Sequence, residues 1–202
     1  MKFHFSLLAV FFLFTQCIAQ KQQLQFALGT NFNGTGDTKG LGFLTEYNKK
    51  FKKRLSWSVS LGGTINDGSF GILYEYPQGQ QRDGSVRYTI AGFQGTSHLG
   101  FSVFSSNTGN LVFRLGSVIR YQSSSYWDIV NILYEPITGL PYPVIVFENT
   151  SPQKTLALGG SSQLSYSYTL KNRICLGILA SFQFDTQGDT ISQLLFTIGK
   201  RF

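Results

Sequence analysis

TISQLLFTIGKRF, residues 190–202, is the stretch that decides the fold of this chain. Within it, Phe196 and Ile198 alternate with Thr197 and Gly199. This period of two is typical of a β-strand, because successive side chains point to opposite faces of a sheet. The apolar strand runs to the last residue, whereas the ends of soluble domains usually fray. We therefore expect the last strand to pair with the first and to remove the open edge of the sheet.

The chain begins with the pattern of a secretory signal peptide. Lys2 gives a positive start, and residues 5–14 form an apolar run. At about ten residues this run is too short to span a bilayer. We expect cleavage after Ala19, so that residues 1–19 are the signal peptide and residues 20–202 are a single β-barrel domain.

The composition favours strands and turns over helices. The chain has 22 glycines and 15% aromatic residues, whereas only 13% of its residues are charged. After the signal peptide, no apolar run approaches the roughly 20 residues of a transmembrane helix. No stretch combines helical periodicity with capping signals. An all-β fold is the expectation.

Eight segments of the mature chain alternate between apolar and polar residues. In the clearest one, Trp57 and Val59 alternate with Ser58 and Ser60. In the fourth, the parity changes near Gly92–Gly95, which predicts a β-bulge there. The eight segments are residues 22–32, 41–47, 55–65, 86–104, 111–121, 154–170, 174–184 and 190–202.

The connections between these segments alternate in length. Residues 66–85 and 122–153 are long loops, whereas residues 48–54 and 171–173 are short turns. This alternation predicts an eight-stranded antiparallel up-and-down transmembrane β-barrel, with both termini at the end of the short turns. The apolar faces then point outward, and small or polar side chains fill the narrow interior.

These features together resemble the small outer-membrane β-barrels of the OmpA/OmpX type, the outer membrane protein β-barrel domain family. The resemblance covers essentially all of the mature chain. It implies an integral protein of the bacterial outer membrane, exposed at the cell surface, with both termini in the periplasm. It also implies recognition by the barrel-assembly machinery through Phe196, Ile198 and Phe202. Lys200 departs from that pattern, because an apolar residue is commoner at its position.

Aromatic side chains near the segment ends are expected to form two girdles at the membrane surfaces, with outer-membrane lipid as the partner. The expected girdle residues are Tyr47, Phe51, Trp57, Tyr121, Trp127 and Phe202.

Three charged residues have the parity of the interior: Glu46, Arg114 and Arg120. Glu46 and Arg114 lie near the same end of their segments, so we expect them to form an ion pair across the lumen. Pairing offsets the cost of enclosing a charge. The main interpretation is a structural pair that plugs the barrel, and the alternative is a gate or a narrow pore.

An enzyme that modifies the acyl chains of lipid A is the alternative function. Ester cleavage needs a base beside a nucleophile, and His98 is the only histidine of the mature chain. Ser97 points to the opposite face and Ser102 is too distant, which leaves a partner from another strand open. No Cys/His cluster and no glycine-rich loop before a helix occurs, so we expect no metal and no cofactor. We expect a non-enzymatic protein with a structural or surface-binding role.

The long loop 122–153 is too apolar for a freely solvated loop. Part of it extends the strands above the membrane or covers the mouth as a lid; alternatively, it is a contact surface for a partner. The net charge of +7 comes from basic short turns, while the acids lie mainly in the long loops. This distribution predicts a charged rim and no nucleic-acid partner. A soluble lipocalin-like barrel is the rival fold, but it needs an apolar interior.

Overall fold

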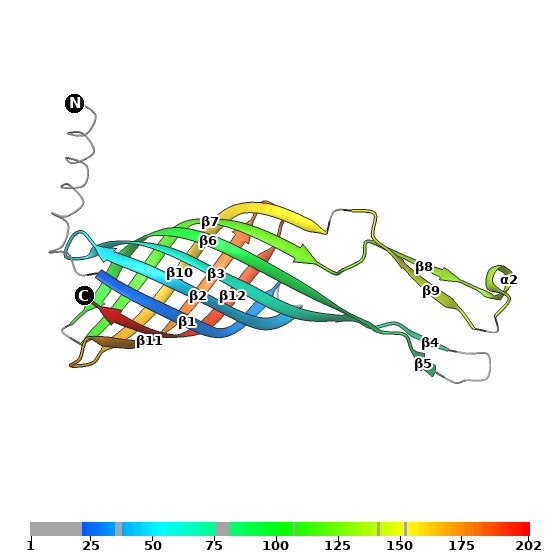
Figure 1. The fold of residues 1–202 in the computed structure, drawn as a ribbon, viewed down its shortest axis with the longest axis horizontal. Coiled ribbons are helices and arrows are strands. Elements are labelled where there is room, and N and C mark those ends of the chain that lie inside the picture. Colours follow the sequence, from blue (N-terminus) through cyan, green and yellow to red (C-terminus); the bar gives the residue numbers. More distant parts are fainter. Residues whose placement is uncertain (1–21, 35–37, 76–80, 107, 141, 152) are drawn as a thin grey trace, which may run out of the picture.

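The computed structural model describes residues 22–202 except 35–37, 76–80, 107, 141 and 152, so the predicted signal peptide lies outside the described residues. Eight long strands form a closed antiparallel barrel, in agreement with the predicted fold (Figure 1). They are β1 (Gln22–Asn33), β2 (Thr38–Lys50), β3 (Leu55–Phe70), β6 (Val86–Ser105), β7 (Gly109–Ser124), β10 (Lys154–Thr169), β11 (Ile174–Asp185) and β12 (Thr190–Arg201).

Each barrel strand pairs with its neighbours in up-and-down order, and β1 pairs with β12 to close the wall. This closing register runs from Gln23 opposite Arg201 to Asn33 opposite Ile191. Beyond it, the backbone N–H of Phe202 donates to the carbonyl of Gln22 at 2.9 Å. The first and last strands therefore remove each other's open edge, as the terminal stretch predicts.

The apolar side chains of the wall point outward, and the interior is polar. Trp57, Phe113 and Phe182 are 39%, 41% and 47% exposed, whereas Ser56 and Ser58 are 1% exposed each. The buried apolar cluster inside is small: Ala27, Leu44, Leu179 and Leu195. This orientation is the predicted one, and it is the reverse of a lipocalin-like interior.

The bulge predicted near Gly92–Gly95 is wrong. The pairing of β6 with β3 runs unbroken through these residues, and the register shift of β6 lies between Ser102 and Phe104, opposite β7. The alternation of apolar and polar residues changes in this part of β6 although its backbone stays regular. The cause is the change in surroundings from the polar lumen to the mouth. Tyr88 and Ile90 continue the lumen-facing parity but line a pocket at the mouth, where apolar surface can be covered.

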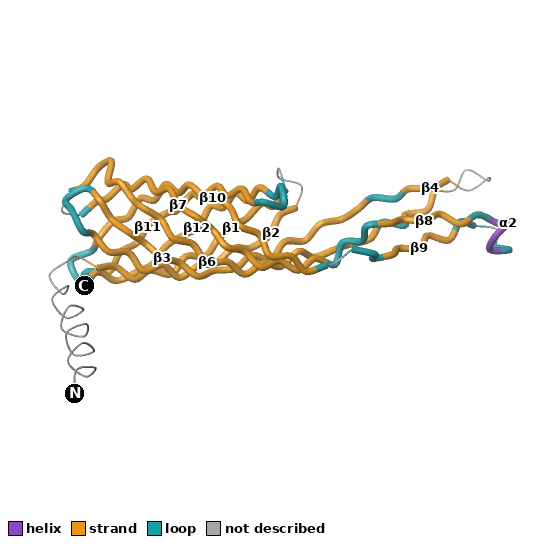
Figure 2. Tube along the Cα trace, turned by 90° about the horizontal axis from the view of Figure 1, so that it is seen from above, coloured by secondary structure: helices purple, strands orange, loops and turns teal. Residues whose placement is uncertain are grey.

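Two hairpins project from one end of the barrel (Figures 1 and 2). The first pairs β4 (Leu73–Glu75) with β5 (Gln81–Asp83), and the second pairs β8 (Ile129–Leu133) with β9 (Val144–Glu148). A four-residue helix, α2 (Glu135–Thr138), lies at the tip of the second hairpin. We call this end the hairpin end and the opposite one, where β1 begins and β12 ends, the short-turn end.

Most of the 122–153 loop forms the β8–β9 hairpin, which the sequence did not predict. Its first residues prolong β7, as expected, but β8 and β9 extend away from the mouth along the barrel axis and do not cover it as a lid (Figure 2). Within the described residues, no helix has the length and apolarity to cross a membrane.

Candidate functional site: the lumen and the mouth of the barrel

The lumen near the short-turn end holds a buried ion pair. Glu46 on β2 and Arg114 on β7 lie with Oε1 and Nη2 3.2 Å apart, and their side chains are 0% and 5% exposed. Gln25 donates to the same Oε1 at 3.0 Å, while Arg114 Nη1 donates to Ser165 Oγ at 2.8 Å. The cluster ties β1, β2, β7 and β10 together across the interior. Removal of either partner would leave the other as an uncompensated buried charge.

Farther along the lumen, His98 lies between two hydroxyl groups. Its Nε2 is 2.6 Å from Ser161 Oγ on β10, and its Nδ1 is 3.3 Å from Thr96 Oγ1. The sequence could not name Ser161, because a contact between strands distant in the chain depends on the register. His98 and Ser161 are 1% and 4% exposed. Ser161 and His98 thus lie within the hydrogen-bond reach that a nucleophile and its base need, although both side chains are buried.

Arg120 occupies the lumen near the hairpin end and is separate from the Glu46–Arg114 pair. Its three nitrogens donate to Gln122 Oε1 at 2.9 Å, Gln94 Oε1 at 3.1 Å and Thr64 Oγ1 at 2.9 Å. Gly92 makes room for it, since a Cβ there would collide with the guanidinium. Among the described residues Arg120 forms no direct salt bridge: neutral amide and hydroxyl oxygens accept its hydrogen bonds, and the carboxylates of Asp185 and Asp189 act on it only at longer range.

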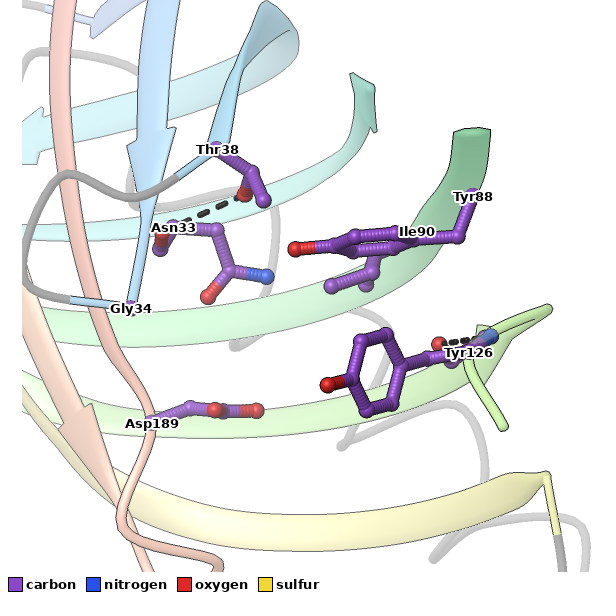
Figure 3. Close-up of a pocket in the computed structure, with 8 residues that line it drawn as sticks. Asn33, Gly34, Thr38, Tyr88, Ile90, Tyr126 and Asp189 are labelled. Atoms are coloured by element: carbon purple, nitrogen blue, oxygen red, sulfur yellow. Dashed lines mark hydrogen bonds between the residues drawn. The ribbon is translucent and has the colours of Figure 1, made fainter. Parts of the chain in front are cut away.

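A cavity of about 270 Å³ opens at the mouth above Arg120 (Figure 3). Gln122 connects the two, because its Nε2 donates to Asp189 Oδ2 at 2.9 Å while its Oε1 accepts from Arg120. Sequence analysis missed this site, since its residues come from five separate segments. The cavity is lined by Asn33, Gly34, Thr38, Tyr88, Ile90, Ser124, Tyr126 and Asp189.

Five of the six predicted girdle residues have surfaces on the outside of the wall or at its ends. Trp57, Tyr121 and Phe202 are 39%, 48% and 60% exposed. Their contact with headgroups remains a prediction. Phe196 and Ile198, expected in the assembly signal, are 72% and 56% exposed on β12. Their recognition also remains a prediction.

Trp127 was wrongly assigned to the girdle, because it is only 5% exposed. It lies in the connection between β7 and β8 and is covered by neighbouring aromatic rings. The ring of Tyr126 stacks on it at 4.9 Å, and the rings of Phe147 and Phe70 contact it at 4.5 and 5.7 Å. Trp127 is thus the centre of a small core that fastens the second hairpin to the barrel.

A carboxylate closes the base of the same hairpin. Asp128 accepts hydrogen bonds from the backbone N–H groups of Thr150 and Ser151, both at 2.8 Å, and from the Thr150 hydroxyl. These bonds, with the Thr150 side chain as the largest contributor, hold the pKa of Asp128 well below its usual range. The hairpin is therefore fastened on one side by aromatic packing and on the other by a charged cap.

The charged groups are unequally distributed over the two ends. The described residues of the short-turn end carry basic side chains and no acidic ones at their surface. These basic residues are Lys49, Lys50, Lys52, Lys53, Arg54, Lys171, Arg173, Lys200 and Arg201. No group of three or more His, Cys, Asp or Glu side chains that could hold a metal ion occurs among the described residues.

The fold matches solved structures of outer-membrane barrels. Ail, the attachment invasion locus protein of Yersinia pestis, in complex with the heparin analogue sucrose octasulfate has a TM-score of 0.55 and 10% identity over 91% of this chain and 99% of that one. A second Ail structure has a TM-score of 0.53 and 9% identity over the same shares of the two chains. No protein-family model and no curated protein matches the sequence. The fold is that of the small eight-stranded outer-membrane β-barrels.

Proposed function

We propose that the protein is a non-enzymatic integral barrel of the bacterial outer membrane that presents a protein-binding hairpin at the cell surface. The observation that supports this most directly is the inverted wall. Leu99, Leu115 and Phe196 are 66%, 56% and 72% exposed on the outside, while serine, glutamine and arginine are buried inside. Exposed apolar area costs about 25 cal/mol per Å² in water, so a wall of this kind requires hydrocarbon around it.

The short-turn end is the periplasmic end in this proposal. Outer-membrane barrels have short periplasmic turns and longer outer loops. Residues 51–54 and 170–173 connect strands at the short-turn end, whereas both projecting hairpins leave the other end. Gln22 and Phe202 lie side by side there, joined by a backbone hydrogen bond.

The lumen is closed by side chains in this proposal and conducts no ions. The Glu46–Arg114 pair, the His98 contacts and the Arg120 network follow one another along the interior, and each links strands that are not neighbours in the wall. An eight-stranded barrel is only wide enough for such side chains. A bilayer recording of the wild type and of Glu46→Gln tests this. Negligible conductance in both agrees with a structural pair, whereas conductance that changes with the substitution contradicts it.

The second hairpin is the proposed contact surface. β8 and β9 form a two-stranded sheet, so each has an edge with unpaired backbone groups. Ile132, Tyr134 and Ile137 are 45%, 61% and 73% exposed on it. A two-stranded hairpin is marginally stable alone, and a partner strand added to its edge covers both the apolar side chains and the backbone groups.

A deletion tests the contact surface. Replacement of residues 129–148 by a short Gly/Ser linker is expected to leave the barrel folded, shown by heat-modifiable gel migration in the membrane fraction, and to abolish cross-linking to surface proteins. Replacement of residues 73–83, the first hairpin, is the matched control. Equal cross-linking in the wild type and in the 129–148 deletion would refute the proposal.

The contact of His98 with Ser161 supports a second candidate, the lipid A acyl enzyme. This candidate requires that lipid A from expressing cells lose or gain acyl chains, and that Ser161→Ala abolish the change. We expect thin-layer chromatography to show the same lipid A with the wild type, with Ser161→Ala and with an empty vector.

A further inference from the structure

The mouth pocket has the features of a small-ligand site that the proposed function does not use. Its walls converge from the end of β1, the start of β2, the upper part of β6, the end of β7 with the residues after it, and the turn before β12 (Figure 3). Five segments surround one cavity, so the barrel wall fixes the positions of the lining groups. At about 270 Å³ the cavity lies just below the usual range for ligand pockets, which limits the ligand to a small molecule or one unit of a polymer.

Asn33 provides the decisive observation. The residue is 3% exposed, and neither its Oδ1 nor its Nδ2 has a hydrogen-bond partner among the described residues. Figure 3 shows this amide pointing into the space between Tyr88, Tyr126 and Asp189. Buried amides are normally satisfied, so a group that is left unpaired inside a cavity calls for an explanation. A ligand that satisfies both atoms has to offer a donor and an acceptor together, as neighbouring hydroxyl groups do.

Asp189 supplies a second, fixed acceptor on the opposite wall. Its Oδ2 accepts from Gln122, and Gln122 is held in turn by Arg120 from the lumen below. The carboxylate is therefore oriented before a ligand arrives, which lowers the entropy cost of binding. A carboxylate accepts hydrogen bonds from hydroxyl groups and repels anions.

Aromatic rings provide the apolar wall. The rings of Tyr88 and Tyr126 meet edge to face with centroids 4.7 Å apart, and Tyr126 is backed by Trp127 at 4.9 Å with an interplanar angle of 14°. The backing holds the Tyr126 ring in place at the pocket. A sugar ring has C–H groups on its face and hydroxyl groups around its rim, so it fits an aromatic wall beside an amide and a carboxylate.

From these groups we propose that the mouth pocket binds one neutral sugar unit, either free or at the end of a glycan. A sulfated or phosphorylated sugar is disfavoured, because Asp189 lies in the pocket and all three donor nitrogens of Arg120 already have partners. An ammonium ligand is disfavoured as well, because a cation leaves the Nδ2 donor of Asn33 unpaired. The inference is independent of partner binding by the second hairpin.

Saturation-transfer NMR on the barrel in nanodiscs is a direct test. The neutral probes are methyl glucoside, methyl galactoside and N-acetylglucosamine. The charged probe is sucrose octasulfate, and plain sucrose is its uncharged counterpart. We expect transfer to at least one neutral sugar and none to the octasulfate. Dextran, a neutral glucose polymer, distinguishes the sources: competition by dextran indicates the end of a glycan, and its absence indicates a free sugar.

Asn33→Leu provides the matched variant. The leucine has a similar shape and no polar atoms, so we expect at least tenfold weaker sugar binding and an unchanged or higher melting temperature, because an unsatisfied amide has been removed. Leu73→Ser on β4 of the first hairpin is the control and should bind sugar like the wild type. Absence of transfer to every neutral sugar, equal transfer in Asn33→Leu, or stronger binding of the octasulfate would each overturn the inference. Sugar binding that survives the 129–148 deletion would show that the pocket acts without the hairpin.

Discussion

The two ends of this barrel are built on opposite principles. At the short-turn end the strands stop together, the connections are a few residues long, and the surface is basic. At the hairpin end several strands continue past the wall, two hairpins project, and acids such as Asp128, Asp185 and Asp189 accompany them. The membrane dictates the wall between the ends but neither end. This contrast fits the proposed function, in which one end anchors the barrel and the other is free to acquire binding surfaces.

In the described part of the chain, each end also holds one salt bridge, and both span 3.2 Å. The Glu46–Arg114 pair is buried in the lumen, whereas the Asp67–Arg87 pair at the hairpin end has side chains that are 57% and 79% exposed. Equal distances here do not mean equal energies, because water screens the outer pair and leaves the inner one unscreened.

Breaking the buried pair should have the largest effect. Glu46→Gln leaves Arg114 charged and without its carboxylate, so we expect about 3–5 kcal/mol of lost stability in urea unfolding from vesicles. Glu46→Gln combined with Arg114→Met should recover most of it, because both charges are then gone. Asp67→Asn at the hairpin end is the matched comparison and should cost about 0–1 kcal/mol. Similar losses for Glu46→Gln and Asp67→Asn would contradict the contrast between the two pairs.

Trp127→Ala should loosen the hairpin end without opening the wall. The loss of a buried aromatic residue costs about 3–5 kcal/mol, but here it falls on the local unfolding of the second hairpin. We expect faster proteolysis within residues 125–150 and unchanged heat-modifiable migration of the barrel. Trp57→Ala, on the outside of the wall, should leave hairpin proteolysis as in the wild type. Loss of the folded barrel band with Trp127→Ala would show that the two regions are not separable.

Neutralising the basic turn should change the lipid preference of the short-turn end. Lys52, Lys53 and Arg54 follow one another between β2 and β3 and are exposed. Each cation near an anionic surface contributes about 1 kcal/mol, and salt screens the effect. With all three changed to Gln, we expect less anionic phosphatidylglycerol retained around the purified barrel at low salt. Lys154→Gln at the hairpin end should retain as much phosphatidylglycerol as the wild type. Equal retention in the wild type and both variants would contradict an anchoring role of the basic turn.

Acid should release the base of the second hairpin with a smaller, local effect. The pKa of Asp128 is lowered from 3.8 by the folded loop. The stabilisation is therefore fully present above that pH and is lost as the pH falls below it. The protection factors of the Thr150 and Ser151 amides, which are corrected for the intrinsic pH dependence of exchange, should fall as the pH drops below about 4, and Asp128→Asn should show the reduced protection already at pH 7. Protection factors in the wild type that stay constant as the pH falls would rule out this cap.

The sequence predicted the wall better than the mouth, and the reason is physical. Lipid on one side and a closed interior on the other impose a period of two, so the outward positions of Trp57 and Phe182 could be predicted from alternation alone. Above the membrane that rule ends. Tyr88 and Ile90 looked like a change of register, and Trp127 looked like a girdle residue, because local packing there buries apolar rings that no pattern marks.

The candidate sites depended on register, which alternation does not give. Glu46 and Arg114 were identified by parity and by their common end, yet Arg120 has the same parity and a different set of partners. Nothing in the sequence distinguishes Asn33, because an asparagine at the end of a strand is common. Its unpaired amide becomes visible only when the closed barrel places Asp189 and Tyr126 across from it.

The seam between β1 and β12 has a consequence for the timing of biogenesis. Every other barrel pair joins strands that follow each other along the chain, with at most a projecting hairpin between them, whereas the seam joins the two ends of the described chain. Until the last strand is delivered, both seam strands carry bare amide and carbonyl groups that hydrocarbon cannot satisfy. We therefore expect the two seam strands to need protection from lipid until β12 pairs with β1 and closes the wall.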